Sequence, residues 1–178
     1  MFKRFYPDEW IDSAYQIDYE KLYNDGIRAL IYDIDNTLVP HGAPADNYAK
    51  TLFKRLHKIG FKIMLLSNNK EKRVKSFCDE VEGAKYIHKA NKPFKKSYLK
   101  AMEMMNVTPK ETVFIGDQLF TDIWGAKASG IYSILVDQID KKEEIQIIIK
   151  RRFEHIVLFF YKRYLKKNRL LNYTSVSR

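Results

Sequence analysis

Two carboxylates stand one residue apart at the end of an apolar run. Residues 29–32 are strand-forming and apolar, and Asp33 and Asp35 follow them directly. A strand with two apolar faces is typical of the middle of a parallel sheet, and open α/β sheets bind ligands where their strands end. Carboxylates at this edge can hold a divalent cation, attack an electrophile or move a proton. Taken alone, the pair fits a polar strand end with an Asx-turn at least as well.

Two later segments supply an oxygen ligand and a cation. Ser67 and Asn68 follow a predicted strand over residues 61–66, and Lys92 precedes Pro93 at the start of a predicted helix. A lysine ammonium at this edge would offset the charge of the carboxylates and of an incoming anion. Pro93 restricts the backbone of Lys92, which favours a defined role for this lysine among the many basic residues of the chain.

A further strand end adds two carboxylates. Asp117 follows a predicted strand over residues 112–115, and Asp122 lies one helical turn beyond it. Because parallel strands end at the same edge of a sheet, we expect both residues to lie near Asp33. Oxygen ligands suit Mg²⁺. The sequence therefore predicts a magnesium site at this edge, near Asp33 and Asp117.

Two other kinds of site have little support. A calcium loop of the EF-hand type that began at Asp33 would need glycine at its sixth position and glutamate at its twelfth. Those positions hold Leu38 and Pro44, and the fifth holds Thr37. The glycine patterns of dinucleotide-binding loops and P-loops are absent from the sequence, which contains only seven glycines. Nucleotide binding through such loops is therefore not expected.

The block Asp33-Ile34-Asp35-Asn36-Thr37-Leu38 resembles the first motif of the haloacid dehalogenase (HAD) phosphohydrolase superfamily. Ser67, Lys92 and residues 116–122 are similar to its second, third and fourth motifs and occur in the same order. Any one of these short motifs is weak or moderate evidence. Their concurrence, each at a predicted strand or helix terminus, is much harder to reach by chance.

The resemblance implies a mechanism. Asp33 would be the nucleophile that forms an aspartyl-phosphate, and Asp35 the general acid and base. Ser67, Asn68 and Lys92 would hold the phosphoryl oxygens. The cofactor implied is Mg²⁺, held by the side chains of Asp33 and Asp117 and the backbone carbonyl of Asp35, with Asp122 in outer support.

Residues 1–140 as a whole resemble the YqeG family of HAD subclass IIIA phosphatases. The likeness is carried by residues 5–9, 33–39, 91–93 and 116–122. This family is related to phosphatidylglycerophosphate phosphatases, which complete phosphatidylglycerol synthesis. The resemblance implies a lipid phosphomonoester as substrate, presented at a membrane surface.

The order of elements predicts a HAD-like, Rossmann-type three-layer α/β/α fold with a central parallel sheet. Helices are expected over residues 46–59, 70–80, 94–105 and 123–129, between the strands named above and two more over 86–87 and 131–136. Residues 1–28 are expected to form an N-terminal extension with one or two short helices. The segments after Leu38 and after Ser67 are too short to hold a cap domain, so the site should be open to phosphates carried on large molecules.

The positive charge is concentrated in the C-terminal tail. The chain has a net charge of +10, but residues 1–140 are nearly neutral, and residues 141–178 are strongly basic. The tail is expected to be one or two amphipathic helices. One predicted face is apolar and is formed by Ile145, Ile149, Phe153, Ile156, Phe160 and Tyr164. The rest of the helix surface carries the basic residues Lys150, Arg151, Arg152, Lys162, Arg163, Lys166 and Lys167.

Such a tail favours an anionic membrane as partner. The alternative is that its apolar face packs on the domain. Cys78 is the only cysteine, so no internal disulfide can form, and no secretory signal or transmembrane-length apolar run is visible. We expect a cytoplasmic protein associated peripherally with the inner face of the membrane.

Two other functions stay open at this point. A capless phosphatase acting on nucleic-acid ends could use the basic tail to grip RNA or DNA. A non-enzymatic receiver-like module could gather the same residue types around a phosphorylatable aspartate. The second carboxylate two residues after Asp33 argues against a receiver.

Overall fold

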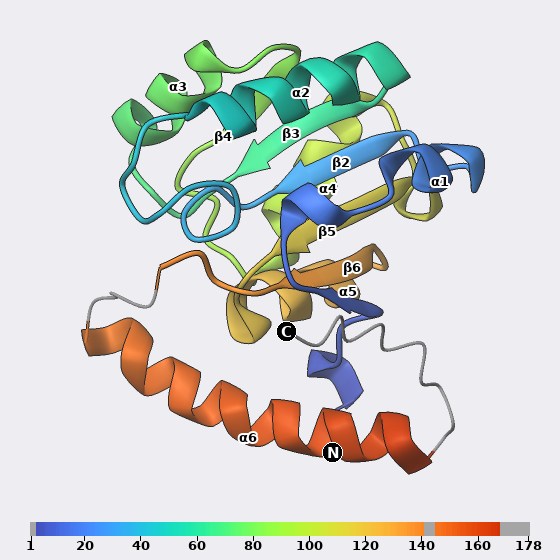
Figure 1. The fold of residues 1–178 in the computed structure, drawn as a ribbon, viewed down its shortest axis with the longest axis vertical. Coiled ribbons are helices and arrows are strands. Elements are labelled where there is room, and N and C mark those ends of the chain that lie inside the picture. Colours follow the sequence, from blue (N-terminus) through green and yellow to red (C-terminus); the bar gives the residue numbers. More distant parts are fainter. Residues whose placement is uncertain (1–2, 141–144, 168–178) are drawn as a thin grey trace.

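A computed structural model describes residues 3–140 and 145–167, the backbone alone for residues 145–152 and 167. Its strands form one parallel sheet in the order β1-β6-β5-β2-β3-β4 (Figure 1). The strands are β1 (Glu9–Ile11), β2 (Ala29–Tyr32), β3 (Lys62–Leu66), β4 (Ala84–Ile87), β5 (Thr112–Gly116) and β6 (Tyr132–Val136). The central position of β2 places the carboxylates that follow it at the middle of the sheet edge.

Helices cover both faces of this sheet (Figure 1). The α-helices are α1 (Tyr19–Asn24), α2 (Asn47–Ile59), α3 (Glu71–Glu80), α4 (Lys95–Met105), α5 (Trp124–Ala128) and α6 (Ile145–Lys167). The short turns are the 3₁₀ helices η1 (Lys3–Phe5), η2 (Ala14–Gln16) and η3 (Pro109–Glu111) and the π-helix η4 (Leu119–Ile123). The three-layer α/β/α fold with a parallel sheet is confirmed.

The alternation of side chains along β2 explains the two layers of core. Leu30 and Tyr32 pack with α2 and α3, and Ala29 and Ile31 pack with α4 and α5. All four side chains are fully buried, as expected for a strand covered on both faces. Cys78 is buried in the first of these layers, as expected for a small core residue.

The N-terminal extension contains an expected short helix, α1, which Asp18 caps, but it also contains a strand that the sequence analysis did not predict. Residues 9–11 form strand β1, which pairs with β6 at the edge of the sheet. Trp10 Nε1 donates to Asp137 Oδ1 at 2.7 Å and helps to fasten this edge. A three-residue strand carries too little periodicity to be recognised, because it depends on pairing with a distant segment.

Helix α6 lies along the β1–β6 end of the sheet (Figure 1). Among its described side chains, Glu154, Val157 and Tyr161 are buried. Of the predicted apolar face, Phe153, Ile156 and Phe160 are exposed, whereas Tyr164 is half-buried, with its ring centroid 5.4 Å from that of Tyr6. The predicted members Ile145 and Ile149, the basic residues 150–152 and 167, and segments 141–144 and 168–178 lie outside the described side chains.

Candidate active site

The chain turns sharply where β2 ends. Asn36 adopts a left-handed backbone conformation with φ of 65°, and its N–H donates to the carbonyl of Val39 at 2.7 Å. An asparagine tolerates this conformation better than most residues. The turn leaves Asp33 and Asp35 at the carboxyl edge of the sheet and connects directly to α2, without an inserted domain.

Three carboxylates from distant parts of the chain converge at this edge. Asp33 follows β2, Asp117 follows β5, and Asp122 lies in η4. One oxygen of each lies within 4.8 Å of the others, and all three side chains are buried. Asp33 and Asp117 are therefore close enough to share one ion, as the predicted site requires.

Lys92 supplies the positive charge of this cluster. Its Nζ donates to Asp33 Oδ1 and to Asp122 Oδ1, both at 2.7 Å, and the side chain is 4% exposed. The backbone of Lys92 is held by Asn68, whose Oδ1 accepts from Lys92 N–H at 2.7 Å and whose Nδ2 donates to Lys92 O at 3.3 Å. The side chain of Asn68 therefore positions Lys92. The expected contact between Asn68 and a phosphoryl oxygen stays a prediction.

Ser67 lies at the end of β3, the strand beside β2, and is buried. Its Oγ accepts a hydrogen bond from Asn69 N–H at 3.1 Å. A serine hydroxyl that accepts one bond still has a proton to donate. This placement is compatible with the predicted contact between Ser67 and a phosphoryl oxygen.

Asp35 points to a different set of partners. Its Oδ1 accepts from Gly42 N–H at 2.7 Å and from the Arg73 guanidinium at 2.9 Å, and its Oδ2 accepts from Asn69 Nδ2 at 2.7 Å. The side chain is thus separate from the carboxylate cluster, which leaves the backbone carbonyl as its only expected route to a metal.

Arg73 and Asn69 were missed by the sequence analysis. Arg73 lies on the α3 face that also carries Val74 and Phe77, and its guanidinium lies 5.7 Å from the centroid of the Phe77 ring. An arginine on the apolar face of a helix that follows a polar strand end was the available signal, since a buried guanidinium needs a partner.

The π-helix η4 positions Asp122. Gln118 N–H donates to Asp122 Oδ2 at 3.1 Å, and Tyr98 Oη donates to the carbonyl of Thr121 at 2.7 Å. The sequence predicted an ordinary helix that begins at residue 123, but the preceding residues form this wider turn. Single π-turns occur frequently at functional sites.

The electrostatics of the cluster favour a bound cation. Burial, together with the nearby carboxylates of Asp122 and Asp117, raises the pKa of Asp33 to about 8 against the opposing charge of Lys92. Burial acts to lower the pKa of Lys92, but Asp122 and Asp33 outweigh it and raise that pKa above its usual value. Even with Asp33 protonated, the other two buried carboxylates and one ammonium leave an excess of negative charge, and hard oxygen donors are the ligands of Mg²⁺ and similar ions. The residues present therefore fit a divalent cation.

Metal binding should depend on pH through Asp33. Because a proton and a cation compete for this carboxylate, the apparent affinity for Mg²⁺ should rise by up to about tenfold per pH unit towards pH 8 and level off above it. Titration calorimetry between pH 6 and about 9 measures this dependence. An Asp33→Asn variant removes the competing group, so a slope of the same size in that variant would contradict the assignment.

Gly116 leaves the space that Asp122 occupies. A Cβ at residue 116 would lie 2.5 Å from Asp122 Oδ2 and 2.7 Å from Asp122 Cβ. Gly116→Ala should therefore displace a buried carboxylate of the cluster, with a stability loss of about 1–3 kcal/mol and weaker Mg²⁺ binding. Thermal melts with and without Mg²⁺ measure both effects. Equal stabilisation of variant and wild type by Mg²⁺ would show that Asp122 does not support the ion.

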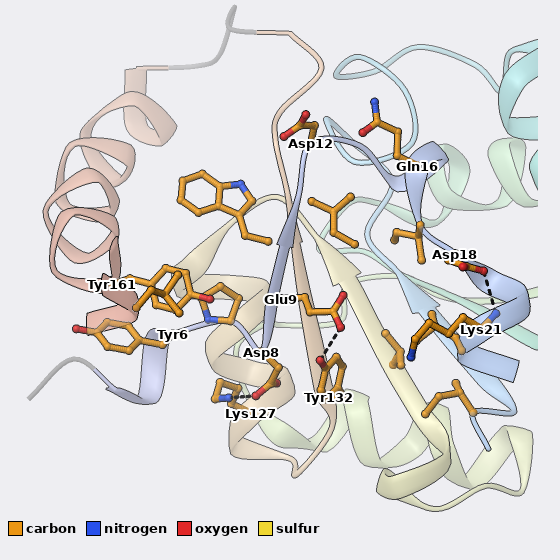
Figure 2. Close-up of a pocket in the computed structure, with 18 of the residues that line it drawn as sticks. Tyr6, Asp8, Glu9, Asp12, Gln16, Asp18, Lys21, Lys127, Tyr132 and Tyr161 are labelled. Atoms are coloured by element: carbon orange, nitrogen blue, oxygen red, sulfur yellow. Dashed lines mark hydrogen bonds and ion pairs between the residues drawn. The ribbon is translucent and has the colours of Figure 1, made fainter. Parts of the chain in front are cut away.

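A hollow in the described structure lies away from this cluster. It has a volume of about 1070 Å³ and is lined by residues of β1, α1, β6 and α6 (Figure 2). Its polar groups are largely paired with one another: Lys127 with Asp8 at 2.6 Å, and the Tyr132 hydroxyl with Glu9 at 2.8 Å (Figure 2). We therefore assign the chemistry to the carboxylate cluster and not to this hollow.

Comparisons with known proteins agree with this geometry. The family model of haloacid dehalogenase-like hydrolases matches residues 9–130. The chain belongs to this family. It is also 34% identical to the probable phosphatase YqeG of Bacillus subtilis, over 92% of this chain and 95% of that protein, and so is a member of the HAD phosphatases.

Two more distant matches each cover two thirds or more of this chain. Phosphatidylglycerophosphate phosphatase 1 of Arabidopsis thaliana is 25% identical over 85% of this chain and 45% of its own length. A solved dehalogenase shares the fold, with a TM-score of 0.55 and 14% identity over 67% of this chain and 89% of that one.

Among the residues that the structure describes, no helix is long and apolar enough to cross a membrane.

Proposed function

We propose that this HAD phosphatase is a Mg²⁺-dependent phosphomonoester hydrolase that converts phosphatidylglycerophosphate to phosphatidylglycerol. The observation that carries the phosphatase activity is the convergence of Asp33, Asp117 and Asp122 around Lys92. The lipid substrate is supported by two further facts: the short connections after β2 and β3, which place no cap over the site, and the likeness to a phosphatidylglycerophosphate phosphatase.

The side chains divide the reaction into two steps. Asp33 attacks phosphorus, a P–O bond to the carboxylate forms, and the bond to the leaving lipid oxygen breaks as Asp35 donates a proton to that oxygen. Asp35 then takes a proton from a water molecule that attacks the aspartyl-phosphate, which releases phosphate and restores Asp33. Lys92 and Ser67 hold the phosphoryl oxygens during both steps. A bound Mg²⁺ would offset the repulsion between the carboxylate and the phosphate.

The contacts of Asp35 suit a group that must keep its position while it exchanges a proton. Gly42, Asn69 and Arg73 fix both of its oxygens from outside the carboxylate cluster. Asp35→Asn keeps the size of the side chain but removes the acid and base, and should lower kcat by about 10²- to 10⁴-fold. Phosphate release measured in that variant at the wild-type rate would contradict the assignment.

Release of phosphate from a panel of phosphomonoesters tests the substrate. The panel contains phosphatidylglycerophosphate in mixed micelles, p-nitrophenyl phosphate, glycerol 3-phosphate and a 5′-phosphorylated oligonucleotide, each with Mg²⁺ or EDTA. We expect kcat/KM for the lipid to exceed the soluble esters by about a hundredfold, since binding of its remote parts contributes to the rate. A preference for the oligonucleotide would favour action on nucleic-acid ends, and no hydrolysis of any ester would favour a binding module.

A further inference from the structure

Helix α6 displays a row of large apolar side chains to solvent. Phe153, Ile156, Phe159 and Phe160 are 60%, 51%, 57% and 43% exposed, and we call these four residues the apolar ridge. Their spacing of three and four residues places them on one side of the helix. Exposed apolar residues are common singly, but a contiguous group of this size marks a surface that meets another partner.

The ridge is held outward because the opposite side of α6 is docked. Val157 packs in a cluster with Phe5, Leu119, Ile123 and Leu135, and the Tyr161 ring lies 5.1 Å from Tyr6 (Figure 2). The buried carboxylate of Glu154 accepts a hydrogen bond from Phe120 N–H at 3.1 Å. Helix α6 is therefore already packed on its own domain through the opposite side. The apolar ridge is not the side through which the helix binds that domain.

The charges beside the ridge are all of one sign. Arg163 and Lys166 are exposed, and the Arg163 guanidinium lies 5.8 Å from the centroid of the Phe159 ring. Lys162 is also exposed, but its ammonium lies 4.8 Å from the centroid of the Trp10 ring on the docked side. Glu154 is the one acidic residue among residues 153–166, and it is buried. An apolar strip flanked by cations is the pattern of a helix that lies in the interface of an anionic membrane.

This combination distinguishes among the possible occupants. A second copy of the chain, related by two-fold symmetry, would bring these cations against their own copies, which is unfavourable. A nucleic acid would satisfy the cations but would leave the four apolar side chains without a function. An anionic lipid surface satisfies both features at once, because its headgroups attract the cations and its acyl boundary takes the apolar side chains.

We propose that the apolar ridge of α6 inserts into the surface of an anionic bilayer and holds the catalytic domain there. This proposal rests on the proposed function, because binding of the ridge to a bilayer would bring the active site to a lipid phosphomonoester. The site and the ridge belong to one packed unit. Glu154 bonds to η4, which carries Asp122, and Ile139 N–H donates to the carbonyl of Asn36 at 3.2 Å where the chain leaves the sheet towards α6 (Figure 1).

Flotation with vesicles tests the proposal on the full chain. The vesicles are phosphatidylcholine alone or phosphatidylcholine with phosphatidylglycerol, without any phosphomonoester lipid. Wild type should float with the anionic vesicles, and F159S/F160S should bind them at least about tenfold more weakly because it removes two apolar anchors. R163Q/K166Q should lose about thirtyfold on anionic vesicles and almost nothing on neutral ones.

The matched control changes exposed apolar residues elsewhere. Tyr48 on α2 and Leu99 on α4 are 75% and 50% exposed, so Y48S/L99S should bind vesicles like wild type. All variants should keep the wild-type melting temperature and hydrolyse p-nitrophenyl phosphate at the wild-type rate, which excludes misfolding as the cause.

Three outcomes would overturn the proposal. They are unchanged flotation of F159S/F160S, a dimer in light scattering that F159S/F160S converts to a monomer, and binding of an oligonucleotide by a wild type that ignores anionic vesicles. Failure of the proposed function looks different. Vesicle binding would persist, also in Asp33→Asn, while phosphatidylglycerophosphate would not be hydrolysed.

Discussion

Asp33→Asn should reduce kcat by at least about 10⁴-fold for every phosphomonoester, because an amide cannot form the covalent intermediate. The substitution keeps the shape of a buried side chain at the centre of the site. Lys92 keeps its second partner, Asp122, at 2.7 Å. The loss should therefore come from chemistry and not from unfolding. Phosphate release and acid-quench trapping of a phosphoprotein measure it.

The stability of this variant provides an independent check. Burial raises the pKa of Asp33 in the folded protein to about 8, well above its value in an unfolded chain. The folded state then holds a proton that the unfolded state has lost, so without metal the wild type should lose stability as pH rises towards 8. Asp33→Asn should not show this loss.

Residual turnover of Asp33→Asn within about a hundredfold of wild type would instead indicate direct attack by water.

Lys92→Met should have the second large effect, on both stability and rate. Lys92 is the shared cation of Asp33 and Asp122 in a site where all three side chains are at least nine-tenths buried. Removal of one partner from a buried ion pair leaves uncompensated charge and costs about 3–5 kcal/mol. Loss of a donor to the transferring phosphoryl group should lower kcat/KM by about 10²- to 10³-fold.

Mg²⁺ distinguishes the two roles of Lys92. Added Mg²⁺ should restore part of the stability of Lys92→Met, because the cation replaces the missing charge among the carboxylates, but it should not restore the rate. Thermal melts and steady-state kinetics give the two readouts. Lys96→Met on the exposed side of α4 is the matched control. A stability loss no larger than that of this control would contradict a central electrostatic role for Lys92.

The location of the site could be predicted because its signals are local. Each strand shows its own apolar run, and Asp33, Ser67 and Asp117 each stand directly after such a run. Parallel pairing then brings the ends of different strands to one edge, whatever the details of packing. For this reason the positions of the expected residues could be assigned without knowledge of any contact between them.

The partners of these residues could not be predicted in the same way. Arg73 reaches Asp35 across 38 positions of sequence, and Asn68 holds Lys92 across 24. Such contacts depend on how α3 and the chain before α4 pack against the sheet. Asn68 shows the limit of prediction from sequence. A polar side chain near a strand end can bind the ligand itself, or it can position a neighbouring residue that binds the ligand.

By itself, the sequence determined the parallel sheet, the four motif positions and the basic character of the tail, because these follow from local hydrophobic periodicity and residue type. Only the tertiary structure decided that residues 9–11 pair with β6 and that Glu154, Val157 and Tyr161 form the docked face of α6. Helical periodicity shows two apolar sides on this helix. Contact with the surface formed by η1, η4 and β6 determines which of these two sides is buried.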